Sequence, residues 1–197
     1  MMKRLAIKFK TKISASDSAM RLHRKEAEKY RKHIQEACSL YNFQDSVIAG
    51  IGSRESGWGL FLKPKGPIGT GDFTPRGRLS GYRNTVLPTD GLGFGRGLMQ
   101  IDYDYHEFAR TGNWRDPREN ILYGTKLLCG NKNIIKKRTI YSGDELLRAV
   151  IASYNAGPGG IIKAYKRGLN IDHFTTGGDY SKDVLNRAGY FQLFGWE

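Results

Sequence analysis

One glutamate, Glu55, has the surroundings that an acid catalyst needs. It ends a largely apolar run, VIAGIGSRES at positions 47–56, that predicts a buried helix, and Trp58 follows closely. A carboxyl group at such a place is withdrawn from water, which raises its pKa and lets it carry a proton near neutral pH. A protonated carboxyl can donate that proton to a departing glycosidic oxygen. The Arg54-Glu55 pair also fits the exposed end of an ordinary helix, so the residues alone leave both interpretations open.

The other residues that commonly carry catalysis form no recognisable pattern. His106-Glu107 lacks the second histidine of a zinc-binding HExxH motif, the four histidines are scattered, and no GxSxG sequence occurs. The glycine-rich stretch at 91–97 is not followed by a GK[ST] sequence, so a phosphate-binding loop is not indicated. We therefore expect carboxylate chemistry that needs no metal or organic cofactor.

Four short motifs occur in a characteristic order. They are VIAGIGSRES at 47–56, GLMQID at 97–102, SYNAG at 153–157 and DYSKDVL at 179–185. Together they resemble the goose-type lysozymes and, more distantly, the soluble lytic transglycosylases, over most of the chain from about residue 18 to residue 191. The resemblance implies an enzyme that cleaves the β-1,4 bonds between N-acetylmuramic acid and N-acetylglucosamine in peptidoglycan.

The resemblance also assigns roles to individual residues. Glu55 matches the family's general acid, and Asp90 and Asp102 look like the two aspartates that position and activate the attacking water. Six further positions match residues around the sugar or the acid: Gln100, His106, Ile121, Tyr154, Asn155 and Tyr180. Taken alone, Asp90 also fits a turn residue and Asp102 a helix cap, while ordinary helix packing equally explains Ile121.

Hydrolysis fits this assignment better than the transglycosylase reaction. Lytic transglycosylases typically lack the two aspartates and use a hydroxyl group of N-acetylmuramic acid in place of water. An inverting hydrolase holds its second carboxylate about 6.5–9.5 Å from the acid, which leaves room for a water molecule. We expect an inverting muramidase. The alternatives are a lytic transglycosylase that forms 1,6-anhydro products and, from another class, a non-catalytic protein that binds wall glycan.

Two features depart from the family pattern. Residues 60–89 look like an insertion that could form a lid, extend the cleft or hold a partner, and it weakens the register on which Asp90 rests. The disulfide cysteines of the bird proteins have no obvious counterparts here. Cys38 and Cys129 are therefore either two reduced thiols or one bridge of this chain's own.

Apolar spacing predicts one lysozyme-like α+β domain that is predominantly α-helical. The stretch 57–97 holds eleven of the 25 glycines and four of the six prolines, which predicts a long loop or small β-region lining the cleft. The catalytic domain is expected to span 18–197, after a basic arm at 1–17. Helices are expected over about 18–41, 45–57 and 98–108, from Asp116-Pro117 onward, and over 142–157, 161–166 and 179–191.

The chain of 197 residues has a net charge of +13, from 32 Lys and Arg against 19 Asp and Glu. This charge favours an anionic partner, and we expect bacterial peptidoglycan rather than nucleic acid, because no nucleic-acid-binding motif frames the basic residues. No apolar run is long enough to cross a bilayer. The N-terminus has a basic start, but the apolar stretch that follows is interrupted by Lys8, Lys10 and Lys12. It therefore lacks the apolar core of a secretory signal. We expect a monomer that is secreted or otherwise delivered to the bacterial wall.

Overall fold

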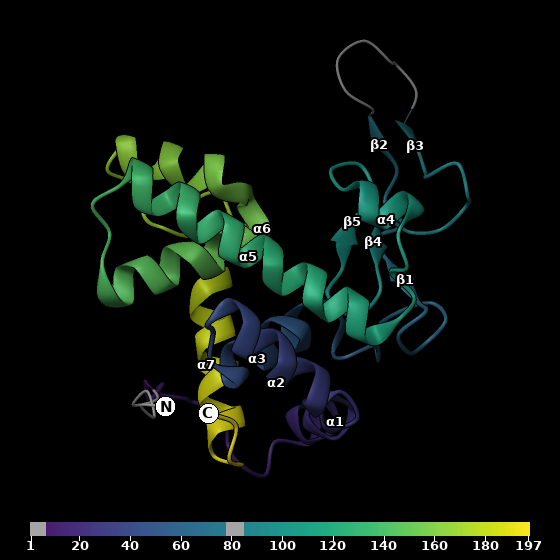
Figure 1. Cartoon of the computed structure of the whole chain (residues 1–197), viewed down its shortest axis with the longest axis horizontal. Helices are drawn as coiled ribbons and strands as arrows, with labels where there is room; N and C mark the ends of the chain where they lie inside the picture. The colour runs from purple at the N-terminus through teal and green to yellow at the C-terminus, as the bar shows by residue number, and fades with distance from the viewer. Residues whose placement is uncertain (1–6, 78–84) are drawn as a thin grey trace.

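Helices build most of the molecule. The computed structural model describes residues 7–77 and 85–197, and within these ranges the chain forms seven α-helices and a small β-region (Figure 1). The helices are α1 (Ser18–Glu28), α2 (Arg31–Tyr41), α3 (Asp45–Ser56), α4 (Glu107–Thr111), α5 (Pro117–Arg138), α6 (Gly143–Lys166) and α7 (Tyr180–Gln192). This confirms the prediction of a predominantly helical α+β domain.

The β-region consists of very short antiparallel strands. β1 (Thr70–Gly71), β4 (Gly95–Arg96) and β5 (Ile101–Asp102) form one sheet in the order β1-β4-β5, with Gly95 opposite both Gly71 and Asp102. β2 (Arg76–Gly77) pairs with β3 (Thr85–Val86) in a separate hairpin. Figure 1 shows these strands and α4 on one side of the molecule and most of the helices on the other, with α5 running between the two parts.

Helix α3 is the centre of the core. Its residues from Ser46 to Ser53 are all buried, and it packs against α7. A Cβ atom at Gly50 would lie 2.7 Å from the carbonyl oxygen of Val184, so the close approach of the two helices at this point needs a residue without a side chain. The helix ends at Gly57, whose φ of 57° is left-handed. This end places Glu55 at the edge of the core.

The two longest helices, α5 and α6, pack against each other. As the sequence predicts, α5 begins with the cap Asp116, whose side chain accepts a hydrogen bond from the backbone N–H of Glu119, followed by Pro117. Helix α6 is broken at Gly157, where φ is 69° and ψ is 158°, and Pro158 follows. Tyr154 and Asn155 therefore stand in the last turn before the break.

Two helix predictions are wrong in detail. The expected helix over 98–108 is replaced by a turn and strand β5, because Gln100 takes a left-handed φ of 50° and Ile101 then pairs with β4. The expected helix over 18–41 is divided at Tyr30, which leaves helical geometry (φ −112°, ψ 8°) and stacks its ring on Trp58.

The chain before α1 lies along α7. The backbone N–H of Phe9 donates to Gln192 Oε1 at 2.8 Å, and that of Lys12 donates to Asn186 Oδ1 at 2.7 Å.

Residues 1–6 of the expected arm and 78–84 of the expected insertion fall outside the described residues. Cys38 and Cys129 are free thiols. Within residues 7–77 and 85–197, no helix is long and apolar enough to cross a membrane.

Candidate active site

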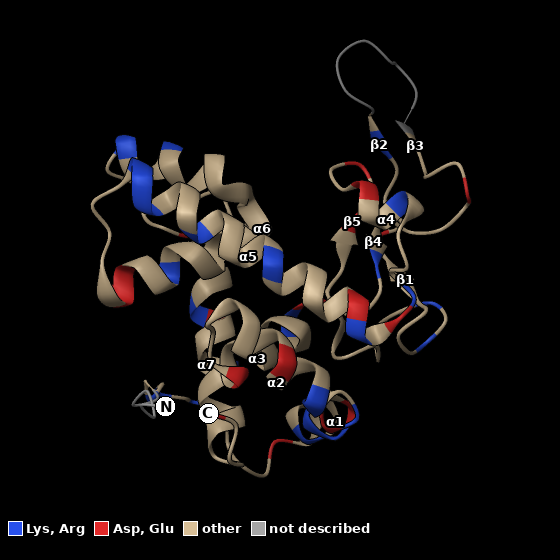
Figure 2. Cartoon of the chain, in the orientation of Figure 1, with Lys and Arg blue, Asp and Glu red and all other residues tan. Residues whose placement is uncertain are grey.

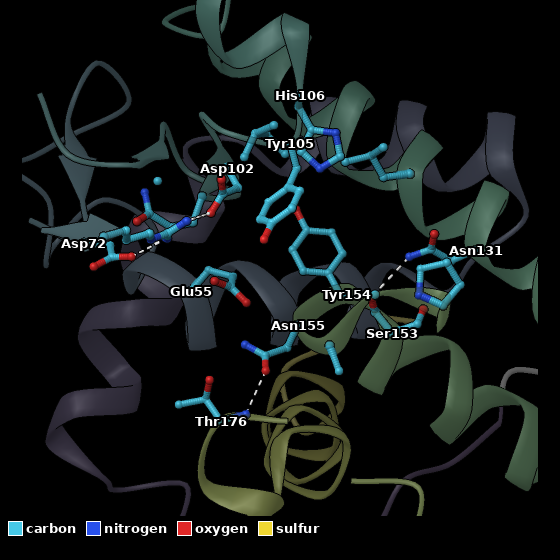
Figure 3. A pocket seen from close by; sticks show the side chains of 18 residues that line it. Glu55, Asp72, Asp102, Tyr105, His106, Asn131, Ser153, Tyr154, Asn155 and Thr176 are labelled. Atoms are coloured by element: carbon cyan, nitrogen blue, oxygen red, sulfur yellow. Dashed lines mark hydrogen bonds and ion pairs between the residues drawn. The ribbon is translucent and has the colours of Figure 1, made fainter. Parts of the chain in front are cut away.

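A cleft of about 730 Å³ opens where the end of α3, the β-region, α5 and α6 meet (Figure 3). Glu55 lies at the end of α3, and Asp72 and Asp102 come from the β-region. The other lining residues are Arg76, Gly95, Gln100, Ile101, Tyr105, His106, Leu127, Asn131, Ser153, Tyr154, Asn155, Ala156, Gly157, Pro158 and Thr176. The cleft thus collects acidic, amide and aromatic side chains from segments far apart in the sequence.

The carboxyl group of Glu55 is held in a state suited to an acid. Burial raises its pKa from 4.5 to about 7, although the Tyr180 hydroxyl and the positive charge of Arg54 pull it down. Glu55 also lies in the last turn of α3, where the helix dipole disfavours negative charge. The hydroxyl of Tyr180 donates a hydrogen bond to Oε1 of Glu55. The proton that Glu55 can release therefore sits on its other oxygen, Oε2.

Behind Glu55, an ion-pair network holds the end of α3 against α7. The guanidinium of Arg54 lies 2.9 Å from Asp183 and 3.3 Å from Asp179. Asp183 also accepts from Arg187 at 2.7 Å, and Arg187 donates to the buried hydroxyl of Ser53 at 3.0 Å. Because these contacts link neighbouring turns of two packed helices, Glu55 has little freedom to move.

Two aspartates form an acidic wall in the β-region. Asp102 ends β5, and its Oδ1 accepts a hydrogen bond of 2.9 Å from the backbone N–H of Asp104. Asp72 directly follows β1, with a left-handed φ of 52°. Both carboxylates pair with the guanidinium of Arg76, and Figure 3 draws these two ion pairs as dashed lines.

Three of the sequence-predicted site residues, Asp90, Ile121 and Tyr180, do not line the cleft. Asp90 lies in a turn, where its Oδ1 accepts from the N–H of Leu92 at 3.1 Å and from the buried Arg96 at 2.9 Å. Asp90 thus has the turn geometry that its alternative interpretation describes, and it neutralises a buried cation. Ile121 is fully buried in the core on α5. Ordinary packing accounts for its place.

The other sequence-predicted residues lie in or directly behind the cleft. Asn155 Oδ1 accepts from the N–H of Thr176 at 2.8 Å, and the hydroxyl of Tyr154 donates to the carbonyl of Met99 at 2.8 Å. His106 Nδ1 is 3.4 Å from the Tyr123 hydroxyl, and burial lowers the pKa of this imidazole, which favours its neutral form. Tyr180 is almost fully buried and acts on the cleft only through Glu55.

Gln100 packs against the sheet below the cleft. Its Nε2 donates to the carbonyl of Gly97 at 2.8 Å. A Cβ atom at Gly71 or Gly95 would lie 2.3 Å or 2.2 Å from its Oε1. A side chain at either glycine would therefore require the end of the Gln100 side chain to move.

Sequence reasoning missed several cleft residues, among them Asp72, Arg76 and Tyr105. The signal for Asp72 is its place directly after Gly69-Thr70-Gly71, a glycine-flanked segment within residues 60–89. Arg76 could not be separated from the other basic residues of the insertion. Tyr105 lines the cleft and is 74% exposed, as a sugar-stacking platform would be. No group of three or more His, Cys, Asp or Glu in the described part of the chain is arranged to hold a metal ion.

Comparisons with known proteins agree with this geometry. The sequence profile of the family "Lysozyme g" matches residues 82–195. Lysozyme g of Gallus gallus is 34% identical over 169 residues, which cover 85% of this chain and 66% of that protein. The match to lysozyme g of Struthio camelus is 33% identical and covers 86% and 69% of the two chains, and that of Casuarius casuarius is 33% identical and covers 86% and 76%. A family profile that covers more than half of the chain, with relatives of this identity, shows that the chain belongs to the goose-type (g-type) lysozyme family.

Proposed function

We propose that this member of the g-type lysozyme family, a glycoside hydrolase, cleaves the β-1,4 bond between N-acetylmuramic acid and N-acetylglucosamine in peptidoglycan with inversion. Glu55 is the general acid, and Asp72 and Asp102 position and activate the water. The observation that carries this proposal is the contrast within one cleft: a glutamate whose pKa is raised to about 7, and a pair of aspartates held by an arginine. Asp72 takes the place that the sequence resemblance gave to Asp90.

In this mechanism each carboxyl group has one task. Glu55 transfers the proton on Oε2 to the glycosidic oxygen, so the leaving sugar departs with a neutral hydroxyl group. A water molecule attacks the anomeric carbon from the opposite face and gives its proton to the aspartate pair. The product carries a free reducing end with inverted configuration. Asn155 and His106, which line the cleft, supply polar contacts to the sugar around these groups.

The experiment that tests this function is mass spectrometry of muropeptides released from purified peptidoglycan. We expect products with free reducing ends, one water heavier than the 1,6-anhydro form. Proton NMR during the first turnovers should show the α-anomer at the new reducing end. Anhydro products would instead establish a transglycosylase, and a lack of release with retained glycan binding would indicate a binding protein. The relatives reported above are all lysozymes, which favours hydrolysis.

Matched variants separate the carboxyl groups. Glu55→Gln should abolish release while the protein remains folded, and Asp72→Asn should reduce it strongly. Asp90→Asn is the control for Asp72→Asn, because it makes the same change at an aspartate that also pairs with an arginine but lies outside the cleft. If Asp90→Asn lost activity per folded molecule and Asp72→Asn did not, the assignment of Asp72 would be wrong.

We further propose that the enzyme acts as a monomer outside the cell or at the bacterial wall, with its positive charge concentrating it on anionic glycan. Figure 2 shows Lys and Arg over several helices, including the last turns of α5 and α6. Salt screens such long-range attraction over about 8 Å at physiological ionic strength, so adsorption to walls should weaken as salt rises. Adsorption that is insensitive to salt would contradict the electrostatic part. Light scattering of the eluting peak in size-exclusion chromatography tests the monomer.

A further inference from the structure

Arg76 reaches the cleft from the segment that departs from the family pattern. It is the first residue of β2, in the hairpin that β2 forms with β3. Its guanidinium carbon lies 4.2 Å from the centre of the Phe94 ring, which is fully buried. The guanidinium therefore lies over the Phe94 ring, next to the start of β4.

The two terminal nitrogens of Arg76 contact two different carboxylates. Nη1 donates to Asp102 Oδ2 at 2.6 Å, and Nη2 donates to Asp72 Oδ2. A third carboxylate, that of Asp104, lies 3.7 Å from Nη1. The rigid fork of an arginine fixes the direction of each hydrogen bond, which the single ammonium group of a lysine cannot do.

The second carboxylate oxygen of each aspartate accepts a hydrogen bond from the backbone N–H two residues further along the chain. Asp102 Oδ1 accepts from the N–H of Asp104 at 2.9 Å, and Asp72 Oδ1 accepts from the N–H of Thr74 at 3.3 Å. Without the guanidinium, two carboxylates on one wall would repel each other. The arrangement is therefore a clamp that sets both the charge and the separation of the pair.

We infer that Arg76 is a positioning residue for the hydrolytic reaction, which holds Asp72 and Asp102 in the one arrangement that directs water to the sugar. This inference rests on the proposed function, because it assigns the aspartates to the water. It gives the expected insertion a role in catalysis, because this segment supplies the guanidinium of Arg76 that pairs with Asp72 and Asp102.

The opposite role, an internal plug that substrate must displace, makes the opposite prediction. A plug would block the cleft, and its removal would raise the rate. A positioning residue is needed for the rate, and its removal lowers kcat because displacing catalytic groups by about 1 Å can cost on the order of 100-fold. The sign of the change in kcat therefore decides between the two roles.

The test compares Arg76→Met with Arg76→Lys, using soluble uncrosslinked peptidoglycan strands as substrate. Methionine keeps an unbranched stem over Phe94 and removes the charge. We expect a loss in kcat of about 10- to 100-fold with KM changed by less than about threefold. Lysine keeps the charge but not the fork, so its kcat should lie between that of Arg76→Met and the wild type.

Arg118→Met is the matched control. Arg118 also joins two carboxylates, those of Glu36 and Glu119, but it does so outside the cleft. It should keep wild-type kcat. If Arg76→Met kept wild-type kcat per folded molecule and lost only thermal stability, or if its kcat rose, the inference would be overturned. Should Arg76→Met fail to fold, a kcat of Arg76→Lys equal to the wild type would overturn it as well.

The failure of this inference can be told apart from failure of the proposed function. Hydrolytic products from the wild type, lost in Glu55→Gln, establish the function whatever the Arg76 variants do. If those products are present and Arg76→Met matches Arg118→Met, only the role of Arg76 is wrong.

Discussion

Replacing Glu55 by glutamine should stabilise the protein in a way that depends on pH. The pKa of Glu55 is about 7 in the folded protein, against an ordinary value of 4.5. Between these two values the folded state binds more protons than the unfolded state, so wild-type stability falls as pH rises through this window. At about 1.36 kcal/mol per pKa unit, the full loss is about 3 kcal/mol and is complete by about pH 8. The uncharged glutamine has no such loss.

The assay is urea or thermal unfolding of the wild type and Glu55→Gln at pH 4, 6 and 8. Their difference in unfolding free energy should change by about 3 kcal/mol, in favour of the variant, between pH 4 and pH 8. For a chain of this size, that corresponds to a relative gain in Tm of about 6–12 °C. Glu107→Gln, the same change at an exposed glutamate on α4, should show no comparable pH dependence.

A difference between the wild type and Glu55→Gln that is the same at all three pH values would refute this reasoning. It would mean that Glu55 ionises in the folded protein as easily as in the unfolded chain. Glu55 would then be mostly a carboxylate at neutral pH, and the case for it as the proton donor would lose its physical basis. The assay needs no substrate, so it tests the acid separately from the reaction.

Three further predictions concern neighbours of Glu55. Tyr180→Phe removes a hydrogen bond that stabilises the carboxylate, so the pKa of Glu55 should rise and the alkaline limb of the kcat/KM profile should move to higher pH; an unmoved limb would contradict this. Asp72→Asn should lower kcat by about 100-fold or more, measured by release of reducing ends. Its control Asp90→Asn should keep kcat but lower Tm, because the buried Arg96 loses its partner. Tyr105→Ala should raise KM about fivefold with little change in kcat, if the exposed ring stacks on a sugar, and an unchanged KM would refute that contact.

The place of Glu55 could be predicted because its causes are local. The apolar residues before it and Gly57 after it lie within a dozen positions, and together they form a buried helix with a sharp end. The same holds for the start of α5 at Asp116 and the break of α6 at Gly157. The contact of Glu55 with Tyr180, in contrast, joins residues 125 positions apart. Only the family resemblance indicated that this tyrosine belongs to the site.

The turn before β5 shows where local spacing misleads. Leu98, Met99 and Ile101 are buried and spaced as on a helix face, which is why a helix was expected. The chain instead turns at Gln100, because that side chain fills the space above Gly71 and Gly95 and Ile101 completes the sheet. The decisive partners lie on other strands, and a window of neighbouring residues does not contain them.

The position of Asp90 outside the cleft shows the same limit of local sequence reasoning. Asp90 stands close to the GLMQID motif along the chain, but the cleft is built by the pairing of β1 with β4, which joins Gly71 to Gly95 across more than twenty residues. Strand pairing tolerates long connections at small entropic cost, so a long connection from β1 to β4 leaves Asp72 in place directly after β1. The number of residues between an aspartate and the GLMQID motif therefore does not indicate whether Asp72 or Asp90 lies in the cleft with Glu55. The pairing of β1 with β4 decides the arrangement, because Asp72, the residue after Gly71, lines the cleft together with Asp102, and Asp90 does not.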